Sequence, residues 1–75
     1  MNGARPRPRP VWICADQVRA GDLIIGPFRM DDPVAVIEHN QQIDGRRYPF
    51  VFRPATGRAW VGVDHDVTLT VQRGQ

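Results

Sequence analysis

Arginine is the residue type in this 75-residue chain whose chemistry points most directly to a partner. All ten basic residues are Arg, and eight acidic residues reduce the formal net charge to +2. A planar guanidinium binds phosphate and carboxylate groups bidentately, but so small a net charge does not by itself imply a nucleic acid. Phosphate binding and codon usage in a GC-rich genome therefore both explain the arginines. The candidate nucleic-acid contacts are Arg5, Arg7, Arg9, Arg46, Arg47, Arg53 and Arg58.

Arginine and proline alternate near the N-terminus, over residues 5–10. Alternating proline forbids a helix and favours an extended polyproline II backbone. We expect residues 1–10 to form a disordered or semi-extended arm outside the folded domain. An arm of this kind can follow a phosphate backbone or enter a minor groove. A solubilising tail and a ligand for another protein are the alternatives.

A basic and aromatic segment over residues 45–53 is the second candidate for nucleic-acid binding. Its aromatic residues Tyr48, Phe50 and Phe52 are two apart, so in a strand they share one face that could stack on bases. The same face turned inward would belong to the core. Pro49 in the middle of the segment favours an edge strand or a bulged strand.

The two tryptophans, Trp12 and Trp60, are candidate anchors for a protein partner, because Trp is enriched at binding hot spots. Packing inside the domain is the alternative interpretation for each of them.

Catalytic and metal chemistry have little support in the sequence. Cys14 is the single cysteine, so neither an intramolecular disulfide nor a Cys-based zinc site can form. Its place beside Ile13 in a strand favours a buried, inert thiol. The chain has no serine, and in the run Asp64-His65-Asp66 a strand would point the imidazole away from both carboxylates. We therefore expect no enzymatic activity, no cofactor and no metal.

Turn signals divide the chain into short apolar or alternating runs that are typical of β-strands. Asp44-Gly45, at the end of the polar segment 39–45, is a strong hairpin signal. Five or six strands at this spacing predict an all-β domain over residues 11–73, a small and partly open barrel. The residues expected to face its core are Ile13, Leu23, Ile25, Val34, Val36, Phe50, Phe52, Val61, Val67, Leu69 and Val71.

The segment Ala15-Asp16-Gln17-Val18-Arg19-Ala20-Gly21-Asp22-Leu23-Ile24 resembles the entry to the first long strand of SH3-like and Hint-type small β-barrels. The run Val63-Asp64-His65-Asp66-Val67 similarly resembles a strand entry of Hint domains. The resemblance implies a barrel topology, a positive φ at Gly21 and a turn capped by the Asp22 side chain. It does not extend to protein splicing, since self-splicing Hint domains need about twice this length and a C-terminal Asn nucleophile.

Together these features predict a non-enzymatic binding module. The first hypothesis is a nucleic-acid-binding module whose arm and arginines contact DNA or RNA, with binding that weakens steeply as salt rises. The alternative is a protein-interaction or assembly module, such as a component of a larger complex or a phage particle. It would bind through Trp12, Trp60 or an open strand edge at residues 23–25. Arginines gathered on one face with the arm would favour the first hypothesis, and arginines interleaved with acidic residues the second.

No apolar run in the sequence approaches the length of a membrane span. The N-terminus also lacks the apolar segment of a signal peptide. The expected location is therefore the cytoplasm, without a membrane partner.

Overall fold

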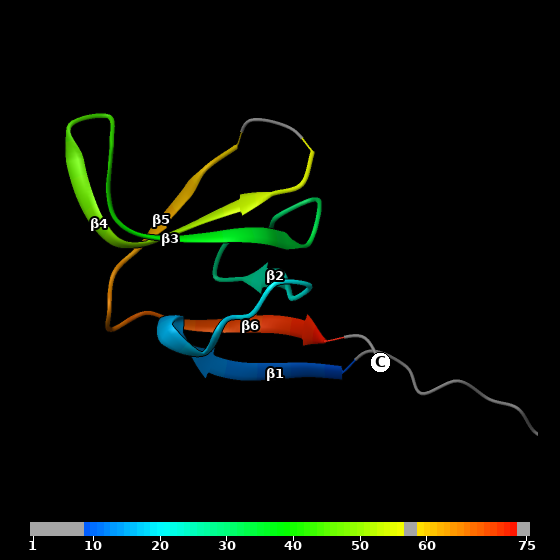
Figure 1. Ribbon diagram of the computed structural model, residues 1–75. Coiled ribbons are helices and arrows are strands. Elements are labelled where there is room, and N and C mark those ends of the chain that lie inside the picture. Colours follow the sequence, from blue (N-terminus) through cyan, green and yellow to red (C-terminus); the bar gives the residue numbers. More distant parts are fainter. Residues whose placement is uncertain (1–8, 57–58, 74–75) are drawn as a thin grey trace, which may run out of the picture.

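The chain folds as an all-β domain, as predicted, in a computed structural model that describes residues 9–56 and 59–73 (Figure 1). The six strands are β1 (Arg9–Cys14), β2 (Leu23–Gly26), β3 (Val34–Ile43), β4 (Arg46–Pro54), β5 (Val61–Val63) and β6 (Thr68–Arg73). One short 3-10 turn, η1 (Ala15–Gln17), is the single helical element of the described residues.

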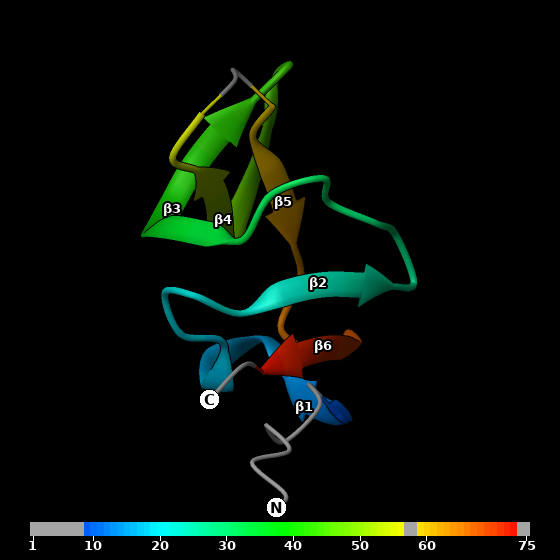
Figure 2. The same ribbon diagram turned by 90° about the vertical axis from the view of Figure 1, so that its right-hand side faces the viewer.

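The strands form two antiparallel sheets of three strands each, with the orders β1-β6-β2 and β3-β4-β5. Both views place β2 as the strand of the first sheet nearest to the second sheet (Figures 1 and 2). The sheets are not closed into one barrel, since no strand ladder joins them in the described residues. Individual backbone hydrogen bonds do connect them. The Gly21 N–H donates to the Val34 carbonyl over 2.7 Å, and the Val34 N–H donates to the Asp22 carbonyl over 2.8 Å.

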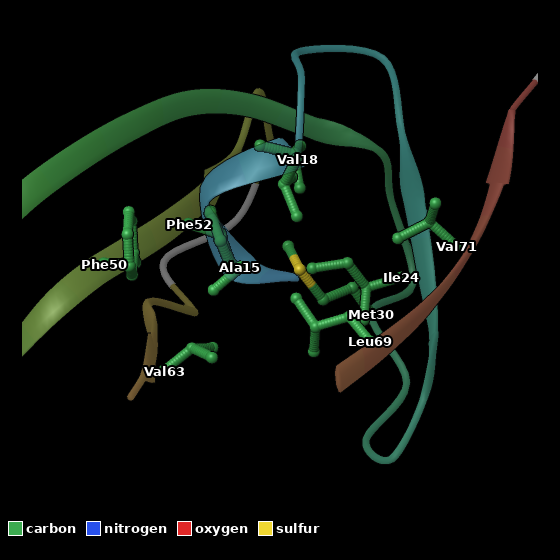
Figure 3. Close-up of a cluster of buried hydrophobic side chains, with 10 residues drawn as sticks. Ala15, Val18, Ile24, Met30, Phe50, Phe52, Val63, Leu69 and Val71 are labelled. Atoms are coloured by element: carbon green, nitrogen blue, oxygen red, sulfur yellow. The ribbon is translucent and has the colours of Figure 1, made fainter. Parts of the chain in front are cut away.

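The core lies between the two sheets (Figure 3). The second sheet contributes Phe50, Phe52 and Val63, and Ile24 and Leu69 lie opposite them on the first sheet. Val34 of β3 and Val71 of β6 also belong to this core cluster, and η1 and the connections supply Ala15, Val18 and Met30. The full membership of the cluster is Ala15, Val18, Ile24, Met30, Val34, Phe50, Phe52, Val63, Leu69 and Val71.

The predicted core is wrong in two strands. In β2 the buried residue is Ile24, which is paired with Val71, and not its neighbours Leu23 and Ile25. Three consecutive apolar residues do not specify which of them faces inward, so the sequence leaves the phase of this strand open. In β3 a register shift after Val34 breaks the alternation, and this break leaves the side chain of Val36 exposed.

The Asp44-Gly45 hairpin is confirmed, and its two central residues have φ values of 51° and 82°. Positive φ at both positions is the signature of the tight hairpin turn that this dipeptide favours. Most of the polar segment 39–45 belongs to β3, because the two-residue turn lets β3 and β4 pair up to Ile43 and Arg46.

An edge strand or a bulged strand was predicted around Pro49, and the edge alternative is wrong because β4 is the central strand of its sheet. Both β3 and β5 pair with β4, but β5 pairs only with residues 50–52. Pro49 lies just beyond that stretch, so its missing N–H costs no hydrogen bond to β5.

The first strand begins at Arg9, two residues before the predicted start of the domain. Arg9 is paired with Arg73, and Pro10 with Gln72. The remainder of the predicted arm, residues 1–8, lies outside the described residues.

Candidate interaction surface

The arginines of the second sheet are held by oxygen atoms of the chain itself. Nη2 of Arg46 lies 2.8 Å from Oδ2 of Asp64, and Nη1 of Arg53 lies 2.8 Å from Oε2 of Glu38. Arg47 donates from Nη1 to the Asn40 carbonyl over 2.6 Å. These three arginines are thus interleaved with acidic and carbonyl groups. Of the other predicted contacts, Arg9 lies at the start of β1, while Arg5, Arg7 and Arg58 lie outside the described residues.

Two of these arginines also cover aromatic rings on the second sheet. The Arg53 guanidinium lies 4.3 Å from the centre of the Trp60 ring, and the Arg46 guanidinium lies 4.8 Å from that of Tyr48. Such contacts between a cation and an aromatic face each contribute about 0.5–1 kcal/mol at exposed sites. Trp60 is half-exposed, at 43%, and the Arg53 guanidinium covers one side of its ring.

Replacement of Arg53 by alanine is expected to lower the free energy of unfolding by only about 1 kcal/mol, because its ion pair with Glu38 is partly exposed. The Trp60 ring loses its cover, so its fluorescence shifts to longer wavelength. Urea unfolding and emission spectra in a Trp12→Phe background measure the two effects. Glu38→Gln is the control, because it removes the ion pair and keeps the stack. An emission maximum shared by both variants would contradict the role given to the Arg53 side chain.

The outward side of the first sheet carries no charge in its described strands. Val11, Ile13, Leu69 and Val71 pack on the core, so the alternation of side chains places their strand neighbours on the opposite face. In β2 a register shift between Ile24 and Gly26 breaks the alternation, and the pairing with Gln72 and Thr70 places Leu23 and Gly26 on that same side. We call that side the uncharged face. Its residues are Pro10, Trp12 and Cys14 of β1, Leu23 and Gly26 of β2, and Thr68, Thr70 and Gln72 of β6.

Trp12 is the most exposed large apolar residue of the described chain, with 70% of its surface accessible. It lies on β1 directly opposite Thr70 of β6. Cys14, on the same side of β1, is also exposed, so the prediction of a buried thiol is wrong. The reason is the phase of β1, because Val11 and Ile13 take the inward positions.

The free edge of β1 offers little to an added strand. Pro10 has no N–H, and the Cys14 N–H already donates to Oε1 of Gln17 over 2.9 Å. Antiparallel pairs alternate between bonded and non-bonded positions, so Pro10, Trp12 and Cys14 are the residues whose backbone groups point away from β6. Trp12 therefore has the one outward N–H of β1 that is open to a partner. Proline and occupied donors protect edges in this way.

The predicted open edge at residues 23–25 is covered along part of its length. The Ile24 carbonyl accepts a hydrogen bond from the Met30 N–H over 2.9 Å. The Asp22 carbonyl, just before the strand, accepts from the Val34 N–H. A partner of the first sheet consequently has better access to its face than to its edges.

A shallow pocket of about 190 Å³ lies beside the second sheet. Its floor includes Met30 and Val61, and Thr56 donates to Oδ2 of Asp32 at its rim over 2.8 Å. Its described lining contains neither His nor Cys, the side chains most often used as bases and nucleophiles. The full lining is Arg29, Met30, Asp31, Asp32, Pro54, Thr56, Ala59 and Val61.

Neither a metal cluster nor a membrane span is found in the part of the chain that the structure describes. No three His, Cys, Asp or Glu side chains there are grouped as metal ligands would be. No helix of these residues has the length and apolar character to cross a membrane. Comparisons of the chain with protein-family models, with curated proteins and with solved structures find no match.

Proposed function

We propose that this chain is a non-enzymatic protein-interaction module that binds its partner through the uncharged face, with Trp12 as the anchor. The observation that carries the proposal is the 70% exposure of Trp12 on a sheet face without charged side chains. The buried centres of protein interfaces are depleted in charge and enriched in aromatic residues. In a chain with 24% charged residues, such a face is a distinct feature.

The distribution of the arginines supports a protein partner over a nucleic acid. Phosphate groups that approached Arg46 or Arg53 would have to compete with Asp64 or Glu38 at 2.8 Å. Nucleic-acid binding gains affinity by releasing counterions from phosphates, and arginines that are already neutralised contribute less to that gain. Binding of DNA or RNA by the arm arginines is the competing function, and the experiment below includes it as an outcome.

The fold proposed for this module is a partly open, SH3-like barrel formed from the two sheets. The support is the pair of hydrogen bonds between Val34 and residues 21–22, which brings the beginning of β3 beside the beginning of β2. A cytoplasmic location is part of the proposal, since an exposed free thiol at Cys14 is suited to a reducing compartment.

Trp12→Ala is expected to abolish partner capture while changing the free energy of unfolding by less than about 0.5 kcal/mol, as for other exposed positions. The full chain serves as bait, and quantitative mass spectrometry compares the wild type, Trp12→Ala and Trp60→Ala. Trp60→Ala is the matched control, because it removes the other exposed indole, which lies just before β5 of the second sheet. Fluorescence anisotropy with single- and double-stranded DNA and RNA at low and moderate salt runs in parallel.

Proteins captured by the wild type and Trp60→Ala, but lost with Trp12→Ala, support the proposed function. Capture that is unchanged by Trp12→Ala contradicts it. Nucleic-acid binding that falls steeply with salt and is indifferent to Trp12 would replace it with the competing function.

A further inference from the structure

We infer that the partner accepted by the uncharged face is a second copy of this chain, bound through the same face. This inference rests on the proposed function, because it names the occupant of the surface described there. Its starting point is one rung of the first sheet, where Thr70 of β6 is paired with Trp12 on one side and with Gly26 on the other.

This rung combines the largest side chain of the sheet with the smallest. The Trp12 indole projects from β1, whereas Gly26 on β2 presents only backbone. A Cβ atom built at Gly26 would meet only Thr70, at 3.5 Å and 3.6 Å. The face therefore has a projection on one edge strand and a depression on the other, at the same height along β6.

A two-fold axis parallel to β6 makes this arrangement complementary to itself. Rotation about such an axis places β1 of one copy over β2 of the other, as an isologous dimer requires. Each Trp12 then lies over the Gly26 of its partner, and the two Thr70 side chains meet at the axis. Facing sheets pack about 10 Å apart, a gap that an indole spans when glycine lies opposite.

Charge also favours this face for self-association. Each copy carries a formal net charge of +2, so two copies repel one another in general. A contact without charged side chains avoids close Arg–Arg approaches, and it buries no ion whose hydration would be lost. The second sheet, which carries Arg46, Arg47 and Arg53, has no such advantage.

The small size of the face limits how strong the dimer can be. Three strands about 4.8 Å apart and six residues of about 3.3 Å each give a face of roughly 20 by 14 Å. Its area of roughly 280 Å² is about a third of the patch of about 800 Å² per partner in a standard interface. The dimer is therefore expected to be weak and reversible, and to form only at high protein concentration.

Sedimentation velocity of the purified full chain over a range of concentrations tests the inference. The wild type is expected to shift from monomer to dimer, and Thr70→Lys and Thr70→Glu are each expected to weaken the dimer at least tenfold, because like charges then meet at the axis. An equimolar mixture of the two variants regains dimer, because Lys then faces Glu. Gly26→Ala, which its own chain accommodates, also weakens the dimer by filling the depression. Circular dichroism confirms that each variant is folded.

A wild type that stays monomeric at several hundred micromolar overturns the inference. If Trp12→Ala still loses a different captured protein in that case, the proposed function survives without it. Thr70 variants that dimerise like the wild type, or that fail to pair when mixed, also overturn it, because the two-fold axis then does not pass through Thr70.

Discussion

Asp22→Ala lowers the free energy of unfolding by about 3 kcal/mol, the loss expected when one partner of a buried ion pair is removed. The Asp22 residue is 4% exposed, and its Oδ2 accepts the Arg19 N–H over 2.9 Å. Arg73 approaches the same carboxylate with both Nε and Nη2, at 3.1 Å and 3.3 Å. A domain of this size has a stability of only a few kcal/mol. The variant is therefore largely unfolded at room temperature, as far-UV circular dichroism in a urea series will show.

Two further variants distinguish the stability lost with the buried ion pair from the stability lost by removing a side chain alone. Glu38→Ala breaks a partly exposed pair and is expected to cost less than about 1 kcal/mol. Asp22→Ala combined with Arg73→Met removes both charges, so part of the stability returns. Equal losses for Asp22→Ala and Glu38→Ala would show that burial of the Asp22 carboxylate adds nothing, and would refute this prediction.

The position of Asp22 explains why so much depends on one carboxylate. Through Arg73 it connects the turn before β2 to the end of β6, and through its own carbonyl it accepts the first N–H of β3. Arg73 also donates from Nη2 to the Gln17 carbonyl over 2.9 Å. The ion pair therefore joins the turn before β2, η1 and the end of β6 at one point, while the bond to β3 belongs to the Asp22 backbone and is kept in Asp22→Ala.

Local turn chemistry was predictable from the sequence, and its distant partner was not. A positive φ at Gly21 and a capping role for the Asp22 side chain were both expected, and the structure has Gly21 at φ 98° and Asp22 bonded to the Arg19 N–H. Arg73 is 51 residues away in sequence from Asp22. Only the pairing of β6 with β2 brings them together, and no pattern in the sequence specifies that pairing.

The residues of the interaction surfaces also could not be predicted from the sequence, because their exposure depends on contacts between distant segments. In the run Val11-Trp12-Ile13, a period of two allows either the tryptophan or its two neighbours to face inward, and packing against Leu69 and Val71 selects the neighbours. The neutralised arginines likewise depend on strand register, which brings Arg46 to Asp64 across 18 residues of sequence. The arginines could be counted in the sequence, but the groups that pair with them could be identified only from the folded structure.

Gly62→Ala is expected to cost about 2 kcal/mol, as overpacking in a well-packed region usually does. Gly62 lies in the middle of β5, directly opposite Val51 of β4. A Cβ atom at this position would come within 2.7 Å of Cδ1 of Tyr48, and closer still to two other ring atoms. These atoms belong to the base of the ring and not to a flexible end, so the whole side chain has to move. Urea unfolding measures the loss.

Displacement of the Tyr48 ring by Gly62→Ala also disturbs Arg46, because the Arg46 guanidinium covers that ring and pairs with Asp64. Tyr48→Ala removes the obstacle, so the double variant Tyr48→Ala/Gly62→Ala is expected to be no less stable than Tyr48→Ala alone. The resulting coupling energy, of about 1–2 kcal/mol, is typical of residues in direct contact. Strictly additive losses would mean that Gly62 is needed for the backbone of β5 and not for the space beneath Tyr48. Non-additivity instead assigns the glycine to the close approach between β5 and the aromatic ring.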